Sequence, residues 1–254
     1  MKFMQSLPKP KYKGTILQLS KYTSKLAAPP AKVYWEYKVP PGEWEMLGND
    51  TVGDCEIARL LHIIMSASAH TGKMLVPTVA EALAVYSAIT GYDPSQTQPD
   101  GSNPTDNGCN SEDVFNYWQK TGISISGVIH KIAGWVQIGS TAAAIKQAIW
   151  LFGAASIDIQ VFQSMMNQTN AKQAWDNPTG DSLGYHAVPG MGFGAAGLTV
   201  ITWAMLQQMG WPICLQIMQG AYAVITPEWI AQNGKTPNGF DLAALQVDLA
   251  AMKQ

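Results

Sequence analysis

Charged side chains are scarce in this 254-residue chain. Asp, Glu, Lys and Arg together make up 13% of it, and the net charge at neutral pH is only −2. Proteins that bind nucleic acid or anionic membranes use clustered Lys and Arg, which this charge balance does not favour. We therefore expect neither nucleic acid nor a membrane among its partners.

Long hydrophobic runs and a leader sequence are also missing. The longest apolar candidate, residues 142–157, is interrupted by Lys146, Gln147 and Gly153, so it does not suit a bilayer span. The N-terminal residues MKFMQSLPKPKYKG are basic but have no apolar segment behind them. These features predict a protein that is cytoplasmic or delivered without a cleaved signal peptide, a phage-associated route included.

Cysteine is rare as well. The three cysteines, Cys55, Cys109 and Cys214, are too few for a disulfide framework, and their odd number leaves at least one free thiol. Free cysteine is often a buried core residue, and a purely structural role of this kind suits Cys214 within GWPICLQIM. Cys109 lies in a polar loop, where loop packing is the simpler interpretation.

Hydrophobic residues make up 47% of the chain, enough for a sizeable core, and their pattern predicts a single α+β domain. Residues 1–47 form an extended, proline-rich arm, residues 48–152 a mainly helical half, and residues 153–254 a mainly β half with a C-terminal helix. The expected helices are 55–71, 77–90, 111–120, 140–152 and 240–252, and the expected strands are 154–161, 184–193, 197–203 and 221–226.

Cys55 begins the first of these helices, directly after the turn-rich loop GNDTVGD. A thiol acts as a nucleophile in its thiolate form, and a helix N-terminus lowers the thiol pKa because its free N–H groups and dipole favour negative charge. Asp54 is the expected N-cap. The position of Cys55 therefore predicts a reactive cysteine.

A catalytic cysteine needs an imidazole base, which we expect on a distant strand. His62 and His70 lie further along the helix of Cys55 and project away from its start, and His130 has no other catalytic residue type nearby. His186 lies at the start of a predicted strand 131 residues after Cys55, within the roughly 130–150 residues that separate cysteine and histidine in one class of cysteine hydrolases. His186 is therefore the predicted base.

Two further residues have spacings that suit a role beside this pair. Asn49 lies six residues before Cys55, where its amide could donate to an oxyanion together with the Cys55 N–H. Thr202 follows His186 by sixteen residues on the returning strand of a predicted hairpin, where it could accept from the second imidazole nitrogen. Trp203 would cover that hydrogen bond from water.

Three short motifs, NDTVGDC (49–55), GYHAVPGMGF (184–193) and VITWA (200–204), resemble the papain-like cysteine peptidases, including their shorter bacterial and phage-associated branches. The resemblance implies a papain-like fold with Cys55 as nucleophile, His186 as base and Asn49 in the oxyanion hole. Two positions depart from the family pattern. The oxyanion amide is Asn instead of Gln, and Thr202 stands where the family has Asn or Asp to orient the histidine.

These observations predict a thiol hydrolase that forms a covalent acyl-enzyme on a peptide, amide or ester substrate. A non-catalytic binding or structural module of the same fold remains an alternative, as does an acyltransferase or esterase that uses the same dyad. We expect no cofactor. The loop DGSNPTDNG lacks the spacing of an EF-hand, and a zinc site from Cys55, Asp106 and His186 has no supporting Cys-x-x-Cys or His pair.

Overall fold

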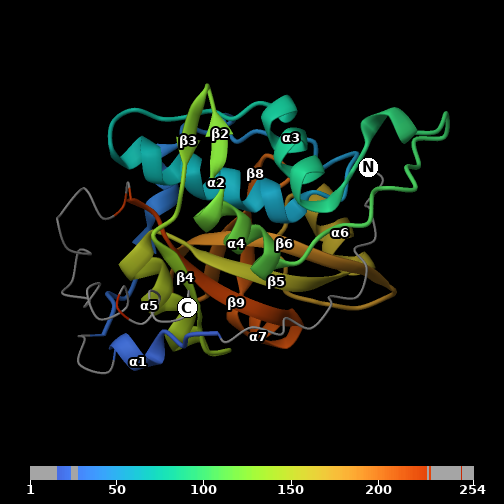
Figure 1. Cartoon of the computed structure of the whole chain (residues 1–254). Coiled ribbons are helices and arrows are strands. Elements are labelled where there is room, and N and C mark those ends of the chain that lie inside the picture. Colours follow the sequence, from blue (N-terminus) through green and yellow to red (C-terminus); the bar gives the residue numbers. More distant parts are fainter. Residues whose placement is uncertain (1–15, 24–27, 228, 230–246, 248–254) are drawn as a thin grey trace.

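A long helix, α2 (Cys55–His70), is the centre of the helical side of the molecule (Figure 1). The computed structural model describes residues 16–23, 28–227, 229 and 247. From Cys55 to Ser68 every residue of α2 is buried, as expected of a helix that is covered on all sides. Helices α3 (Val79–Thr90) and α4 (Ser111–Lys120) pack beside it.

Side-chain caps explain where three of the other helices begin. The Thr78 hydroxyl accepts from the Glu81 N–H, and the Glu81 carboxylate accepts from the Thr78 N–H, which makes a capping box for α3. Asn110 Oδ1 accepts from the Asp113 N–H at the start of α4, and the Thr141 hydroxyl accepts from the Ala144 N–H at the start of α5 (Ala142–Phe152). These starts lie within two residues of the predicted ones.

The other side of the molecule is a seven-stranded antiparallel sheet. Its order is β4-β9-β5-β6-β7-β8, and the short β1 pairs with β6. The strands are β1 (Val33–Tyr34), β4 (Gly134–Gln137), β5 (Ala155–Phe162), β6 (Ser182–Phe193), β7 (Gly197–Thr202), β8 (Met205–Gly210) and β9 (Met218–Ile225). Strand β6 lies in the middle of this sheet and also contacts α2.

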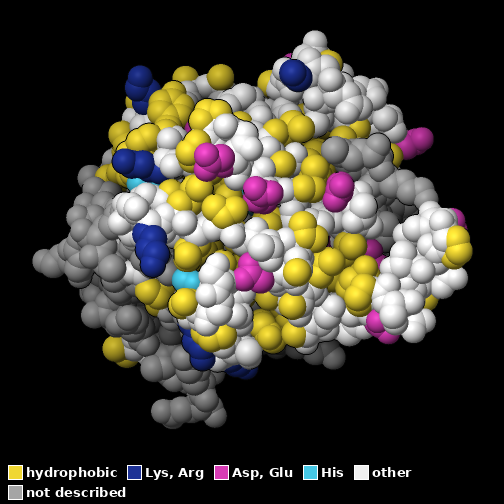
Figure 2. Space-filling model, turned by 90° about the horizontal axis from the view of Figure 1, so that it is seen from above, with side chains coloured by type: hydrophobic (Ala, Val, Ile, Leu, Met, Phe, Trp, Pro, Cys, Tyr) yellow, Lys and Arg dark blue, Asp and Glu magenta, His cyan; other side chains and the backbone are white. Residues whose placement is uncertain are grey.

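The remaining elements are short. They are α1 (Ser20–Thr23), the 3-10 helices η1 (Trp35–Lys38) and η2 (Pro94–Gln96), a separate hairpin of β2 (Ile123–Ile125) and β3 (Val128–His130), and the helices α6 (Gln163–Asn170) and α7 (Trp211–Ile217). Seen from above, hydrophobic and uncharged polar side chains cover wide areas of the surface (Figure 2). The low charge of the sequence is thus also visible on this face.

The predicted α+β class is confirmed, and the strands predicted at 154–161, 184–193, 197–203 and 221–226 correspond to β5, β6, β7 and β9. The predicted turn at 194–197 joins β6 and β7, with the Gly194 N–H donating to Gly197 O. Strands β1, β4 and β8 and the hairpin β2–β3 were not predicted. The main sheet therefore also takes strands from before residue 153. The predicted helix 240–252 lies outside the described residues, apart from residue 247.

Strands β7 and β8 are joined by a turn of two residues, Trp203 and Ala204. Thr202 and Met205 are paired on either side of it, and both turn residues have positive φ angles of 43° and 60°. Such turns favour Asn and Gly, because an L-residue in the left-handed region costs about 1–2 kcal/mol. Here tryptophan and alanine occupy the two positions, and Trp203 is buried.

A buried ionic cluster, formed by Glu56, Arg59, Ser111 and Asp158, joins the helical side to the sheet. Arg59 of α2 donates to Asp158 of β5 at 2.7 Å and is also paired with Glu56. The Ser111 hydroxyl lies 2.8 Å from Asp158 Oδ2 and 3.2 Å from Glu56 Oε1. All four residues are at most 3% exposed. The cluster therefore depends on contacts from both sides of the molecule.

We expect Asp158→Ala to lower the free energy of unfolding by about 3 kcal/mol or more, because it leaves the Arg59 guanidinium buried without its partner on the sheet. Urea unfolding monitored by tryptophan fluorescence measures this change. The exposed Asp181 is a matched control, and Asp181→Ala should stay within about 0.5 kcal/mol of the wild type. Equal effects of the two substitutions would show that the cluster does not contribute to stability.

Candidate active site

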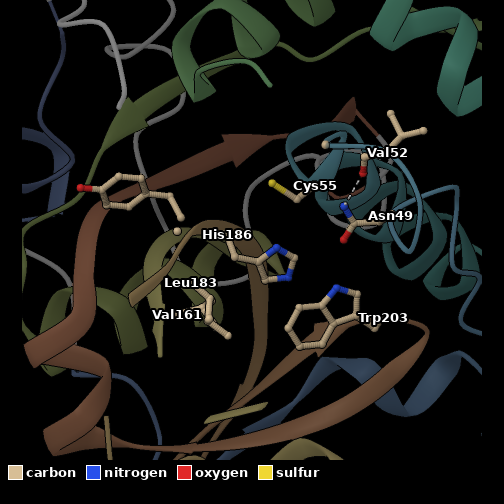
Figure 3. Close-up of a pocket in the computed structure, with 10 residues that line it drawn as sticks. Asn49, Val52, Cys55, Val161, Leu183, His186 and Trp203 are labelled. Carbon is tan, nitrogen blue, oxygen red and sulfur yellow. Dashed lines mark hydrogen bonds between the residues drawn. The ribbon is translucent and has the colours of Figure 1, made fainter. Parts of the chain in front are cut away.

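A pocket lies between the start of α2 and strand β6, and it is walled by both sides of the molecule (Figure 3). Asn49, Val52, Gly53 and Cys55 line it from the helical side. Val161, Leu183, Gly184, Tyr185, His186 and Trp203 line it from the sheet. The structure thus brings the predicted nucleophile, base and oxyanion residue to one cavity.

The loop 48–54 gives Cys55 its place at the edge of this pocket. Gly48 has a φ of 94°, and a Cβ there would lie 3.2 Å from Asp54 Oδ2, so both conformation and space favour glycine. The Gly53 N–H donates to both carboxylate oxygens of Asp106, at 3.0 and 3.2 Å, and the Tyr86 hydroxyl donates to the same carboxylate at 2.6 Å. Asp106 therefore fastens the loop from the 91–110 segment.

Cys55 is the first residue of α2, as predicted, and it is buried. Burial raises the pKa of Cys55 to about 12, and the neighbouring Glu56 and Asp54 carboxylates add to that increase. A backbone hydrogen bond at Ala187 and the charge of Arg59 lower the pKa by less. Desolvation of the sulfur thus opposes the stabilisation expected from the helix N-terminus, and a reactive thiolate at Cys55 stays a prediction.

His186 lies on β6, and its ring is fixed on two sides. Its Nε2 lies 2.8 Å from the hydroxyl of Thr202, the last residue of β7. One face of the imidazole stacks on Trp203, with 4.6 Å between ring centroids and 12° between the planes. Trp203 is 5% exposed, so the ring and its hydrogen bond are shielded from water.

The environment of His186 disfavours the charged imidazolium. Burial lowers the pKa of His186 to about 3, and Arg59 and His62 lower it further. The thiol and the imidazole are therefore both neutral near pH 7. With the Thr202 hydroxyl held at Nε2, Nδ1 is the ring nitrogen left to face the pocket, where it can accept a proton.

Asn49 lines the same pocket, but its amide is engaged within its own loop. Nδ2 donates to Asp54 Oδ1 at 3.2 Å and to Val52 O at 3.5 Å, and Figure 3 shows the second of these contacts. Asp54 occupies the N-cap position of α2, yet its side chain makes no capping hydrogen bond. Its role as a side-chain cap is therefore not observed, because its carboxylate turns toward Asn49.

The other histidines and cysteines do not line the pocket. His62 contacts Glu45 O at 2.8 Å through Nε2, and His70 contacts Trp35 O in the same way. Cys109 and Cys214 are free thiols, and Cys214 is fully buried. Within the described ranges we find no group of three or more His, Cys, Asp or Glu side chains that could hold a metal ion. No helix there has both the length and the apolar character needed to cross a bilayer.

Sequence reasoning did not find the contacts that support the site. Arg59 and Asp158 are 99 residues apart, and Asp106 reaches Gly53 across 53 residues. One signal was available for the first pair, since an arginine within the mostly apolar stretch ARLLHIIM indicates a buried partner. Nothing in the sequence identifies that partner.

The comparisons with known proteins identify a fold. No family model and no curated protein sequence matches the chain. Among solved structures, xylellain, a cysteine protease from Xylella fastidiosa, is 14% identical with a TM-score of 0.63 over 89% of this chain and 96% of its own. Procathepsin B from Trypanosoma congolense is 11% identical, with a TM-score of 0.58 over 89% and 87%. The Carica candamarcensis cysteine protease CMS1MS2 is 15% identical, with a TM-score of 0.55 over 78% and 99%.

At these identities the likeness applies to the architecture. In this chain Cys55 opens the central helix of the helical half, and His186 lies on the antiparallel sheet of the other half. The chain therefore has the α+β fold of the papain-like cysteine proteases.

Proposed function

We propose that the protein is a cysteine-nucleophile hydrolase that cleaves a peptide-type bond through a covalent acyl-enzyme. One observation carries the proposal: Cys55 and His186 line one pocket from opposite halves of the molecule, and Thr202 holds the far nitrogen of the imidazole. The structural relatives described as cysteine proteases favour a peptide over other acyl substrates.

In the first step, Cys55 Sγ attacks the carbonyl carbon while its proton passes to His186. Because the resting pair is neutral, proton transfer and attack occur together once the substrate has bound. The S–C bond forms, and the carbonyl electron pair moves to oxygen. The oxyanion collapses, the C–N bond breaks, and the imidazolium protonates the leaving amine. Water then hydrolyses the thioester with His186 acting as base.

Thr202 serves to orient the base. By accepting from Nε2–H it fixes the tautomer in which the other ring nitrogen is free to take the thiol proton. A hydroxyl carries no charge, so it stabilises the imidazolium less than a carboxylate would. The Cys55 backbone N–H and the Asn49 amide would donate to the oxyanion.

A non-catalytic module of the same fold is the second candidate. Two features favour it: the buried Cys55 thiol with its raised pKa, and Thr202, a hydroxyl instead of an Asn or Asp, as the partner of His186. Both reduce the reactivity of the Cys55–His186 pair. Turnover distinguishes the two candidates.

The first prediction concerns the nucleophile. We expect the wild type to cleave members of a panel of fluorogenic peptides and Cys55→Ala to lose at least about 1,000-fold in kcat/KM, since no other group in the pocket supplies a nucleophilic sulfur. Cys214→Ala, which removes a buried thiol outside the pocket, is the matched control and should retain turnover. Equal activity of wild type and Cys55→Ala would exclude Cys55 as the nucleophile.

The second prediction concerns pH. With a thiol pKa of about 12 and an imidazole pKa of about 3, the thiolate fraction of Cys55 grows with pH across the neutral range. We expect the rate of Cys55 alkylation by iodoacetamide to rise about tenfold per pH unit from about pH 6 to 9, measured by peptide-resolved mass spectrometry. A rate that stays constant over this range would reveal a preformed thiolate–imidazolium pair instead.

The third prediction concerns Thr202. Thr202→Val keeps the shape of the side chain and removes the hydroxyl, so His186 Nε2 is left buried without its partner. We expect kcat to fall on the order of tenfold with KM changed less than about twofold, and Thr202→Asn to restore most of kcat. The control is Thr199→Val on the same strand, whose buried hydroxyl accepts from Gln208 outside the pocket. Equal kcat values for the two valine variants would contradict a role for Thr202.

A further inference from the structure

Asp54, the residue before Cys55, is buried in a way that its place in the fold does not explain. It is 0% exposed, and among the described residues Oδ2 has no hydrogen-bond partner. Burying a carboxyl group without full hydrogen bonding costs free energy, so a group of this kind calls for a functional explanation. Asp54 does not cap α2 with its side chain, since only its backbone carbonyl accepts from Ile57 and Ala58.

The one side-chain hydrogen bond described for Asp54 connects it to the oxyanion candidate. Asn49 Nδ2 donates to Asp54 Oδ1 at 3.2 Å. The backbone of Gly48 also lies close to this carboxyl group, since a Cβ added at Gly48 would lie 3.2 Å from Asp54 Oδ2. The carboxyl group is therefore held in place and directed at the Asn49 amide.

The two hydrogens of that amide are bonded unequally. The contact with Asp54 Oδ1 is 3.2 Å long, whereas the contact with Val52 O is 3.5 Å, at the upper limit for a hydrogen bond. The hydrogen bond to Val52 O is thus the easier of the two to break. Asn49 and Val52 both line the pocket that Cys55 lines.

We propose that Asp54 is a positioning residue for the oxyanion hole: it anchors one N–H of Asn49, while the other N–H leaves Val52 O and turns to the substrate oxyanion. This inference rests on the proposed hydrolase function. It also explains how asparagine, which is shorter than glutamine, can serve here, because an anchored amide needs less freedom to reach a fixed point.

The protonation of Asp54 is compatible with this role. Burial raises the pKa of Asp54 well above its usual range; the hydrogen bond from Asn49 lowers it, and the charge of Asp106 raises it. In either protonation state the carboxyl group has an oxygen that accepts from Asn49. An asparagine at position 54 should therefore substitute for it.

The test compares Asp54→Ala, Asp54→Asn, Asn49→Ala and the double variant Asp54→Ala/Asn49→Ala. Asp50→Ala is the matched control, because it removes a carboxylate from the same loop. Three quantities are measured with the full chain: kcat and KM on a peptide substrate, the inhibition constant of a peptide aldehyde, and the rate of Cys55 alkylation by iodoacetamide. The aldehyde forms a tetrahedral adduct whose oxygen occupies the oxyanion hole, whereas alkylation requires only the thiol.

We expect Asp54→Ala to lower kcat and weaken aldehyde binding on the order of tenfold, as Asn49→Ala does, with KM and the alkylation rate changed less than about twofold. The double variant should be no worse than Asn49→Ala alone, because Asp54 acts through Asn49. Asp54→Asn and Asp50→Ala should stay close to wild type.

Additive losses in the double variant, wild-type behaviour of Asp54→Ala, or an equal loss of alkylation and aldehyde binding would each overturn the inference. If Asp54→Ala does not fold, Asp54→Val fills the space without offering an acceptor, and the same comparisons apply. Absence of turnover in the wild type would overturn the proposed function and the inference together, whereas turnover with any of the first three results overturns only the inference.

Discussion

The ion pair between Arg59 and Asp158 is the constraint on which the arrangement of the site depends. Cys55 belongs to one half of the molecule and His186 to the other, so their alignment requires a fixed relation between α2 and the sheet. Arg59 lies one helical turn beyond Cys55, and Asp158 is paired with Ala187, the neighbour of His186. Separating a buried charge from its partner costs free energy, so the pair opposes displacement of one half against the other.

Burial of Cys55 and His186 is the main influence on the pKa values of the two groups. A helix N-terminus favours a thiolate by a modest amount, whereas the removal of water from Cys55 and His186 disfavours both charged forms strongly. The pKa of the thiol rises to about 12 and that of the imidazole falls to about 3. In the proposed mechanism, charge separation therefore waits for a substrate, whose oxyanion would accept from the Cys55 N–H and the amide of Asn49.

Local patterns in the sequence predict much of this fold, and contacts between distant residues account for the rest. The apolar periodicity behind Cys55 predicts α2, and the hairpin signal at 194–197 predicts the return of the chain that brings Thr202 back toward His186. Strand β8 escapes notice because MLQQMG has neither β-branched residues nor a strict alternation. The direction of the Asp54 side chain is equally hidden, since a carboxyl group before a helix signals a cap in the absence of tertiary information.

The two-residue turn at Trp203 and Ala204 ties the end of β7 to the position of the aromatic ring beside His186. In a strand, side chains alternate between the faces, so the register of β7 on β6 decides whether Thr202 faces His186. The turn begins directly after Thr202, and the Trp203 ring stacks flat on the imidazole. An insertion in the turn would therefore displace that ring, whereas a slip of one residue between β6 and β7 would send the Thr202 hydroxyl away from the histidine.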